Sequence, residues 1–214
     1  HLITEDDAPV DNRYSERQMT LLTLPLFDSW PQGKPFEALT DVGLFSKPDN
    51  ESVVVPDFLL TLGVEPRPVS EAKEDRSYYV WLYGKPPNLV VEIVSNKVGG
   101  ELERKFEIYQ RIGVAFYAVY DPFHELGQRD LRLFRLEGGR YVEMVNPFTI
   151  PELSLGFTLW EGTFLDVTDR WLRFVDEQGH LIPTGNEKAE AAIGEAEAAR
   201  DEAEAAKNAE RDAL

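Results

Sequence analysis

Two short runs of branched aliphatic residues, each interrupted by one acid, constrain the fold of this chain more than any other feature. Asp57 lies in VVVPDFLL at residues 53–60, and Glu92 lies in LVVEIV at residues 89–94. Such runs indicate strands that are buried on both faces. A carboxylate there loses its hydration unless a cation or strong hydrogen bonds compensate for the loss. Two such acids on neighbouring strands can share one divalent metal ion.

The side chains that the sequence lacks narrow the chemistry further. The 214 residues include no cysteine, and the three histidines are His1, His124 and His180. The absence of cysteine excludes disulfides, thiol catalysis and cysteine metal sites, and three scattered histidines disfavour a His-based triad or a His-rich metal site. Carboxylates must then carry any metal chemistry, and carboxylate oxygens favour Mg²⁺ or Mn²⁺.

The charge argues against a broad basic surface for nucleic acid. The formal net charge is −17, and residues 185–214 contribute nine acids and four bases, which leaves about −12 on the remainder. This balance lowers the expected affinity for nucleic acid but permits local basic patches. There is no run of 18 apolar residues and no signal peptide. With the lack of cysteine, these absences predict a soluble, cytoplasmic protein without a membrane partner.

The pattern between residues 88 and 120 predicts a strand–helix–strand unit. Two apolar runs, 88–95 and 115–120, flank a helical pattern at 101–112, which Gly113 caps. Such a unit indicates a parallel or mixed sheet in an α/β domain, which we assign to residues 1–184. The other predicted elements are a helix at 16–30, paired strands at 36–45 and 53–62, strands at 77–82 and 153–160, and hairpins at 129–145 and 172–182.

The last thirty residues, 185–214, form a second unit of different composition. They are rich in alanine and glutamate, and alanines recur at a spacing of three and four: Ala189, Ala192, Ala196, Ala199, Ala203, Ala206 and, after a break at Glu210, Ala213. This narrow seam suits a coiled coil or a helix that docks on a neighbour. A solvated helix that frays is the alternative, because alanine buries little area. We expect a helical tail and a homo-oligomer that can form through it.

Lys105 is a third candidate for the site. It lies on the apolar stripe of the predicted helix, three residues after Leu102 and four before Tyr109. A lysine that faces the core can meet carboxylates beneath it. Two acids would then hold a metal ion, and the lysine would orient or deprotonate a water molecule and offset charge on a phosphate.

Several ordered blocks of the sequence carry a resemblance to a known family. The chain resembles the Uma-two-type family of putative restriction endonucleases, also called domain of unknown function 820, over roughly residues 14–214. The blocks are VPD at 55–57, PNLVVEIVS at 87–95, ERK at 103–105 with Tyr109, and RIGVAFYAVYDP at 111–122. The resemblance implies the PD-(D/E)XK nuclease-like fold. That fold is an α/β, restriction-endonuclease-like mixed β-sheet core flanked by helices, here with added β-hairpins and a C-terminal Ala/Glu-rich helix.

The resemblance assigns roles by position. Asp57 and Glu92 match the two acids of the motif, and both would bind the metal. A lysine two residues after the second acid would fall at Val94, so Lys105 on the following helix is the match. Lys97 is a poorer candidate, because it lies in a predicted loop.

An acid on the first helix joins the site in many nucleases of this superfamily. Glu16 is the candidate here, although an ordinary surface glutamate is the favoured interpretation. For the other acids the alternatives are structural, since Asp57 can cap a turn and Glu92 can form an internal salt bridge.

Together these observations predict an enzyme with a nucleic-acid substrate. We expect a Mg²⁺- or Mn²⁺-dependent endonuclease that hydrolyses phosphodiester bonds of DNA, with Asp57, Glu92 and Lys105 as catalytic residues. The alternative is a catalytically silent assembly or regulatory module, which keeps the nuclease fold and acts through its C-terminal helix. The net charge and the tail favour the alternative, whereas the intact Asp–Glu–Lys set favours the enzyme.

Overall fold

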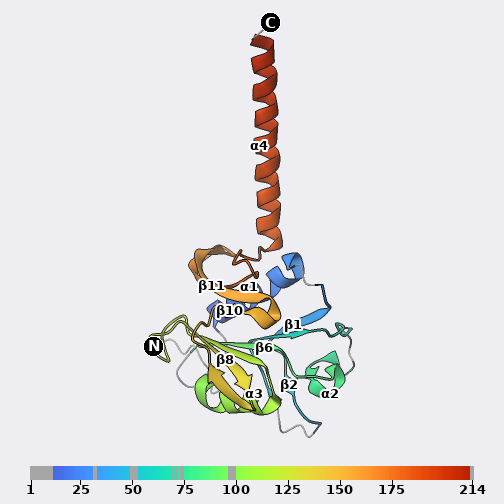
Figure 1. The fold of residues 1–214 in the computed structure, drawn as a ribbon, viewed down its shortest axis with the longest axis vertical. Helices are drawn as coiled ribbons and strands as arrows, with labels where there is room; N and C mark the ends of the chain where they lie inside the picture. The colour runs from blue at the N-terminus through green and yellow to red at the C-terminus, as the bar shows by residue number, and fades with distance from the viewer. Residues whose placement is uncertain are drawn as a thin grey trace.

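A six-stranded mixed sheet forms the centre of the computed structural model (Figure 1). The structure describes residues 12–30, 33–48, 53–68, 70, 72, 75–95 and 100–212. In spatial order the strands are β1 (Phe36–Thr40), β4 (Phe58–Leu62), β6 (Leu89–Ile93), β7 (Phe116–Tyr120), β8 (Leu131–Glu137) and β9 (Arg140–Glu143). Strands β6 and β7 pair in parallel, and the other neighbours pair antiparallel. The predicted mixed α/β sheet is confirmed.

The connection between β6 and β7 is the predicted helical crossover. Every residue of β6 and β7 is buried, which explains why both read as continuous apolar runs. A π-helical turn, η2 (Glu101–Lys105), follows β6 and continues into α3 (Phe106–Ile112). Gly113 ends α3 at φ +91°, a conformation that favours glycine. The strand–helix–strand unit is therefore confirmed, with a π turn that the sequence did not indicate.

One face of the sheet is covered by α1 (Arg13–Ser29) and a three-stranded sheet, which lie above it in Figure 1. That sheet consists of β10 (Thr149–Ile150), β11 (Leu155–Phe164) and β12 (Val167–Val175), with a 3₁₀ turn, η3 (Pro151–Leu153), between β10 and β11. The layers meet in one apolar core that includes Leu22, Leu60, Val91, Leu133 and Leu172.

The other face is covered by α3 and a small sheet. That sheet contains β2 (Leu44–Phe45), β3 (Val53–Val54) and β5 (Tyr78–Tyr79), and α2 (Val80–Tyr83) follows β5. Leu59, Val90, Tyr109, Tyr117 and Val119 belong to the second core on this side. Because side chains alternate along a strand, Glu92 shares this face with Val90.

Two predicted strands are each divided in two, which corrects the position of Asp57. The segments 36–45 and 53–62 form β1 with β2 and β3 with β4. The first breaks at Asp41, whose φ is +52°, and the second breaks at Pro56, which has no N–H group for a ladder. Asp57 therefore lies immediately before β4, whereas the sequence pattern predicts a position inside a strand.

Two other predictions for β structure need correction. The predicted strand at 77–82 contains only the two residues of β5 before α2 begins. The predicted hairpin at 172–182 is a bridge between Val175 and Leu181, and the larger hairpin pairs β11 with β12. The turn between β11 and β12 uses Leu165 and Asp166 at positive φ; aspartate tolerates this conformation, but leucine is not a typical signal for such a turn. The predicted turn at Gly138-Gly139 joins β8 to β9, with φ +57° and +82°.

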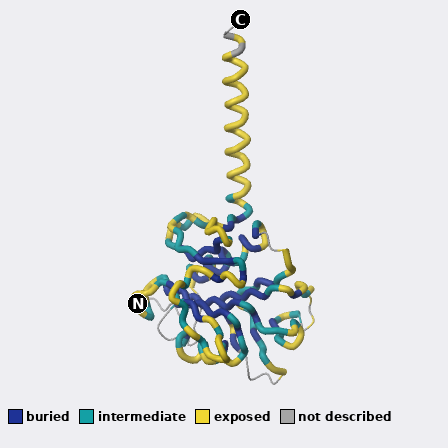
Figure 2. Tube along the Cα trace, viewed as in Figure 1, coloured by how far each residue is buried: buried dark blue, intermediate teal, exposed yellow. Residues whose placement is uncertain are grey.

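The C-terminal helix α4 (Gly185–Asp212) extends away from the rest of the chain, and Figure 2 shows it exposed along most of its length. Its first turn is anchored. Thr184 Oγ1 accepts from the Glu187 amide, and the Glu187 carboxylate accepts from the Thr184 amide, which is a capping box. The same carboxylate binds both terminal nitrogens of Arg173 at 2.7 Å, and only 1% of that arginine side chain is exposed. No helix in the described ranges is long and apolar enough to cross a membrane.

Replacing Glu187 with alanine is expected to destabilise the whole domain. The variant leaves the buried Arg173 guanidinium without its carboxylate, and we expect a loss of about 2–3 kcal/mol in the free energy of unfolding. Urea denaturation measures the change. Glu190→Ala is the control, because Glu190 is exposed on the same helix and should change stability by less than about 0.5 kcal/mol. Equal stability of the two variants would contradict the anchoring role.

Candidate active site

The register of β4 and β6 brings the two predicted acids to one end of the sheet. Phe58 lies opposite Val91 in this antiparallel pair. Asp57 precedes Phe58 and Glu92 follows Val91, so the acids continue the same ladder on adjacent strands. The amide of Ile93 donates to Asp57 Oδ2 at 2.5 Å, which fixes the Asp57 side chain against β6. Asp57 is 9% exposed and therefore lies at the edge of the solvent.

Glu92 is completely buried and satisfied by two donors. The Lys105 ammonium donates to Oε2 at 2.7 Å, and the Tyr109 hydroxyl donates to Oε1. Burial raises the pKa of Glu92, while the charge and hydrogen bond of Lys105 and the hydrogen bond of Tyr109 act against that rise. Both donors come from the helical segment that follows β6, so the crossover itself supplies the partners of the buried acid.

Lys105 is directed at the acids by the π turn. Its amide donates to the Gly100 carbonyl at 3.0 Å, the hydrogen bond between residues five apart that defines this turn. Burial lowers the pKa of Lys105, but the carboxylates of Glu92, Asp57 and Glu101 outweigh burial, and the net shift is upward. Lys105 is therefore an ammonium at neutral pH. In this state it can orient a water molecule and offset negative charge, but it cannot accept a proton.

Glu101 is a residue of this site that the sequence analysis missed. It is buried, and its Oε1 lies 3.8 Å from the Lys105 ammonium. Its carbonyl accepts from the Tyr117 hydroxyl at 2.8 Å. The spacing of four residues before Lys105 was an available signal, because residues four apart share a helix face.

Neither Glu16 nor Val94 contributes a side chain to the site in the described structure. Glu16 is exposed on α1, which covers the face of the sheet opposite to α3. This agrees with the interpretation of Glu16 as an ordinary surface residue. Val94, where the general motif would have its lysine, is completely buried in the apolar core beside Tyr109. Lys97 lies outside the described residues.

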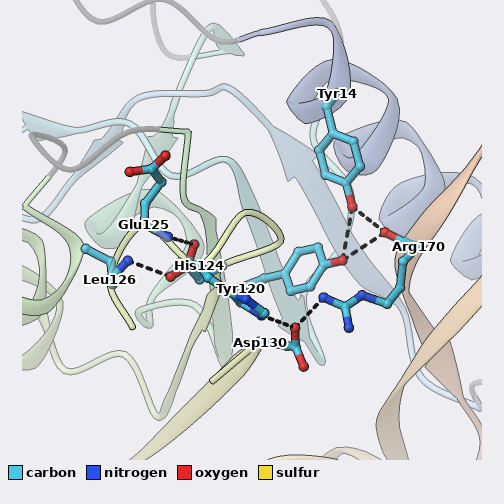
Figure 3. A network of polar contacts seen from close by, with 8 residues as sticks. Tyr14, Tyr120, His124, Glu125, Leu126, Asp130 and Arg170 are labelled. Carbon is cyan, nitrogen blue, oxygen red and sulfur yellow. Dashed lines mark hydrogen bonds and ion pairs between the residues drawn. The ribbon is translucent and has the colours of Figure 1, made fainter. Parts of the chain in front are cut away.

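A polar network on the other side of β7 fixes the strand that borders the site (Figure 3). Tyr120, next to the Val119 that pairs with Glu92, donates to the Arg170 carbonyl at 3.0 Å, and Tyr14 of α1 donates to the same carbonyl. Burial raises the pKa of Tyr120 to about 12, so its hydroxyl stays protonated. The network joins α1, β7 and β12, and we assign it a structural role.

The Arg170 side chain closes the same network onto the loop after β7. Asp130 accepts from the guanidinium of Arg170 and from Nε2 of His124, when that ring nitrogen is protonated. His124, one of the three histidines, is thereby held by Asp130 in the loop between β7 and β8, and among the described residues it joins no group of three that could hold a metal ion.

The donor set at the Asp57 end of the sheet fits a hard divalent cation. The carboxylates of Glu92 and Glu101 lie 2.7 Å and 3.8 Å from the Lys105 ammonium, and the nearby charge of Asp57 also raises the pKa of that ammonium. The acids and histidines of the described residues do not form a group of three or more that could hold an ion together. This still suits Mg²⁺, which is commonly bound by one or two carboxylates and keeps several water molecules.

Comparison with known proteins adds the family. The chain matches the Uma2 family of putative restriction endonucleases over residues 7–168. This chain belongs to that family. A crystal structure of a putative nuclease of domain of unknown function 820 from Anabaena variabilis is similar, with 12% sequence identity and a TM-score of 0.42. The similarity covers 66% of this chain and 72% of that chain. No curated protein matches.

The Glu92–Lys105 pair predicts that the stability lost in the Lys105→Met variant depends on pH. Because the folded-state pKa of Glu92 is raised, the folded protein binds protons more tightly than the unfolded chain, and stability falls as pH rises above about 4.5. Removing the ammonium raises this pKa further. We expect little destabilisation at pH 5 and about 3 kcal/mol at pH 8.

Urea denaturation at both pH values measures this effect. Lys207→Met is the matched control, because Lys207 is exposed on α4 and should behave as the wild type at either pH. A loss of stability in Lys105→Met that is the same at pH 5 and pH 8 would show that Glu92 is not the group left without a partner.

Proposed function

We propose that this protein is a metal-dependent endonuclease that hydrolyses phosphodiester bonds of DNA. Membership of a family of putative restriction endonucleases supports nuclease activity. The observation that carries the finer proposal is the convergence of Asp57, Glu92 and Lys105, with the ammonium 2.7 Å from Glu92 and an amide of the same strand 2.5 Å from Asp57. Acids and a lysine that gather in a partly desolvated position are typical of catalytic sites.

Each residue has a distinct task in the proposed reaction. Asp57 and Glu92 would hold Mg²⁺ or Mn²⁺, which when bound supplies charge stabilisation and an acidified water molecule. Lys105 orients the attacking water molecule and offsets the charge that grows on the phosphate. Tyr109 keeps the Glu92 carboxylate in place by donating to it. Water attacks phosphorus and releases one proton to solvent, the bond from phosphorus to the leaving oxygen breaks, and that oxygen takes up one proton from solvent.

The second candidate function is an assembly module, and the exposure of α4 favours it. The alanine seam of this helix faces solvent from Ala189 to Ala206, and Ile193 beside the seam is 59% exposed. We propose that a second copy of the chain covers the seam, in an antiparallel or parallel helix pair. Self-association and nuclease activity are compatible, so the two proposals are tested separately.

The enzymatic proposal predicts that a divalent ion stabilises the protein through the two acids. Mn²⁺ should raise the thermal midpoint of the wild type relative to chelator, by an amount equivalent to about 2.7 kcal/mol at one hundred times its dissociation constant. Asp57→Asn and Glu92→Gln should lose this response. The same variants and Lys105→Ala should also lose cleavage of a linear DNA duplex by at least about a hundredfold, whereas Lys207→Ala should keep it.

The Mn²⁺ response and DNA cleavage together test whether the acids form a metal-dependent active site. Lys105→Ala should retain most of its response to Mn²⁺, because both carboxylates remain. A wild-type midpoint that does not change with millimolar Mn²⁺ would leave Asp57 and Glu92 as structural acids, and the nuclease proposal would be wrong.

Removing most of α4 should lower the oligomeric state without unfolding the domain. The chain is best ended at Ala191, because this keeps Glu187 and its bonds to the buried Arg173. Multi-angle light scattering at several concentrations measures the mass of both forms. A full-length protein that is already monomeric at high concentration would contradict self-association through the seam.

A further inference from the structure

Glu101 is a buried acid that the proposed reaction does not use. The residue is 5% exposed, and its Oε2 atom is buried without a hydrogen-bond partner. A carboxylate oxygen in this condition is costly, because it has lost its hydration and gained nothing in return. Unsatisfied buried groups of this kind call for an explanation, such as a catalytic role or a bound ion or water molecule.

The main chain holds Glu101 at the site. The Tyr117 hydroxyl donates to the Glu101 carbonyl at 2.8 Å, and the π turn places the Glu101 side chain beside Lys105. Its Oε1 lies 3.8 Å from the Lys105 ammonium, which is itself 2.7 Å from Glu92. After burial and the opposing effects of Lys105 and Tyr109, the Glu101 charge is a further influence that raises the pKa of Glu92. The two carboxylates therefore repel one another across the ammonium.

The ionised side chains of this group carry a net negative charge that a cation would offset. Asp57, Glu92 and Glu101 carry three negative charges when ionised, and Lys105 carries one positive charge. The described acids do not form a group of three that could hold an ion together. Glu101 is therefore not a candidate for direct ligation, and an acid next to a metal site acts on it through its field and through ordered water.

We propose that Glu101 is a positioning residue of the ion site, which strengthens the binding of a divalent cation by Asp57 and Glu92 without being a direct ligand. This inference rests on the proposed function. It explains why a buried, incompletely bonded acid stands four residues before Lys105, and it makes the free oxygen an acceptor for water of hydration. Removal of a partner of this kind from other metal sites weakens binding by about 10- to 100-fold.

Calorimetric titration of the full chain with Mn²⁺ tests the proposal without reference to activity. Glu101→Gln should raise the dissociation constant for Mn²⁺ by at least about tenfold. Its midpoint in chelator should not fall, because the substitution deletes a repelling buried charge. Glu103→Gln is the matched control, since Glu103 is exposed on the same turn and should leave the dissociation constant unchanged. Glu101→Met, which fills a similar volume, should repeat the loss of affinity.

The possible results are distinguishable. A wild type that does not bind Mn²⁺ would contradict the proposed function as well as this inference. A wild type that binds Mn²⁺, together with Glu101→Gln and Glu101→Met variants that bind it equally well, would overturn only the role of Glu101. A midpoint in chelator that falls in both variants, with an unchanged dissociation constant, would mark Glu101 as a structural acid.

Discussion

The burial of the Glu92 carboxylate is the constraint on which the site depends. A fully buried acid on a central strand is tolerated only with donors at both oxygens, and Lys105 and Tyr109 supply them from one helical segment. The segment must therefore begin close to the end of β6 and turn its inner face toward the sheet. The π turn starts the segment soon after β6, and the spacing of four residues along the following helix brings Lys105 and Tyr109 onto the same side. The geometry of the candidate site and the position of the helix are thus set by a single electrostatic requirement.

The parallel pairing of β6 and β7 gives that arrangement its rigidity. Both strands are buried throughout, and their crossover packs on one face while α1 and the β11–β12 hairpin pack on the other. A shift of one residue in β6 would turn Glu92 into the apolar core on the α1 side. The dense packing on both faces therefore protects the position of the acid.

Much of the sheet and of the crossover helix could be predicted from the sequence, because these elements depend on local periodicity. The apolar runs of β6 and β7, and the stripe that includes Lys105 and Tyr109, are direct consequences of the periods of strand and helix. Features that depend on distant contacts could not be predicted in this way. The β11–β12 turn holds Leu165 at a positive φ that leucine does not usually adopt, so the pairing of the two strands decides the turn.

In the candidate site, too, some features follow from local sequence and others from distant contacts. The sequence indicated Asp57, Glu92 and Lys105 as candidates by residue type and position, and the register places Asp57 against β6 even though Pro56 interrupts its strand. The sequence did not indicate that Tyr109 and Glu101 would be their partners. The sequence analysis places Tyr109 on the apolar stripe and assigns no role to Glu101. Their roles follow from the depth of burial, which local periodicity does not report.

The direction in which α4 leaves the domain has a consequence for access. The helix starts beside α1, where Asp28 accepts from the Gly185 amide at 2.7 Å, whereas α3 lies on the opposite face of the sheet (Figure 1). Glu92 bonds Lys105 and Tyr109 on that opposite face. A partner that bound the 28-residue helix, roughly 42 Å long, would contact the molecule on the α1 side. In the proposed nuclease, attachment through α4 would therefore leave the side that carries Asp57, Glu92 and Lys105 uncovered.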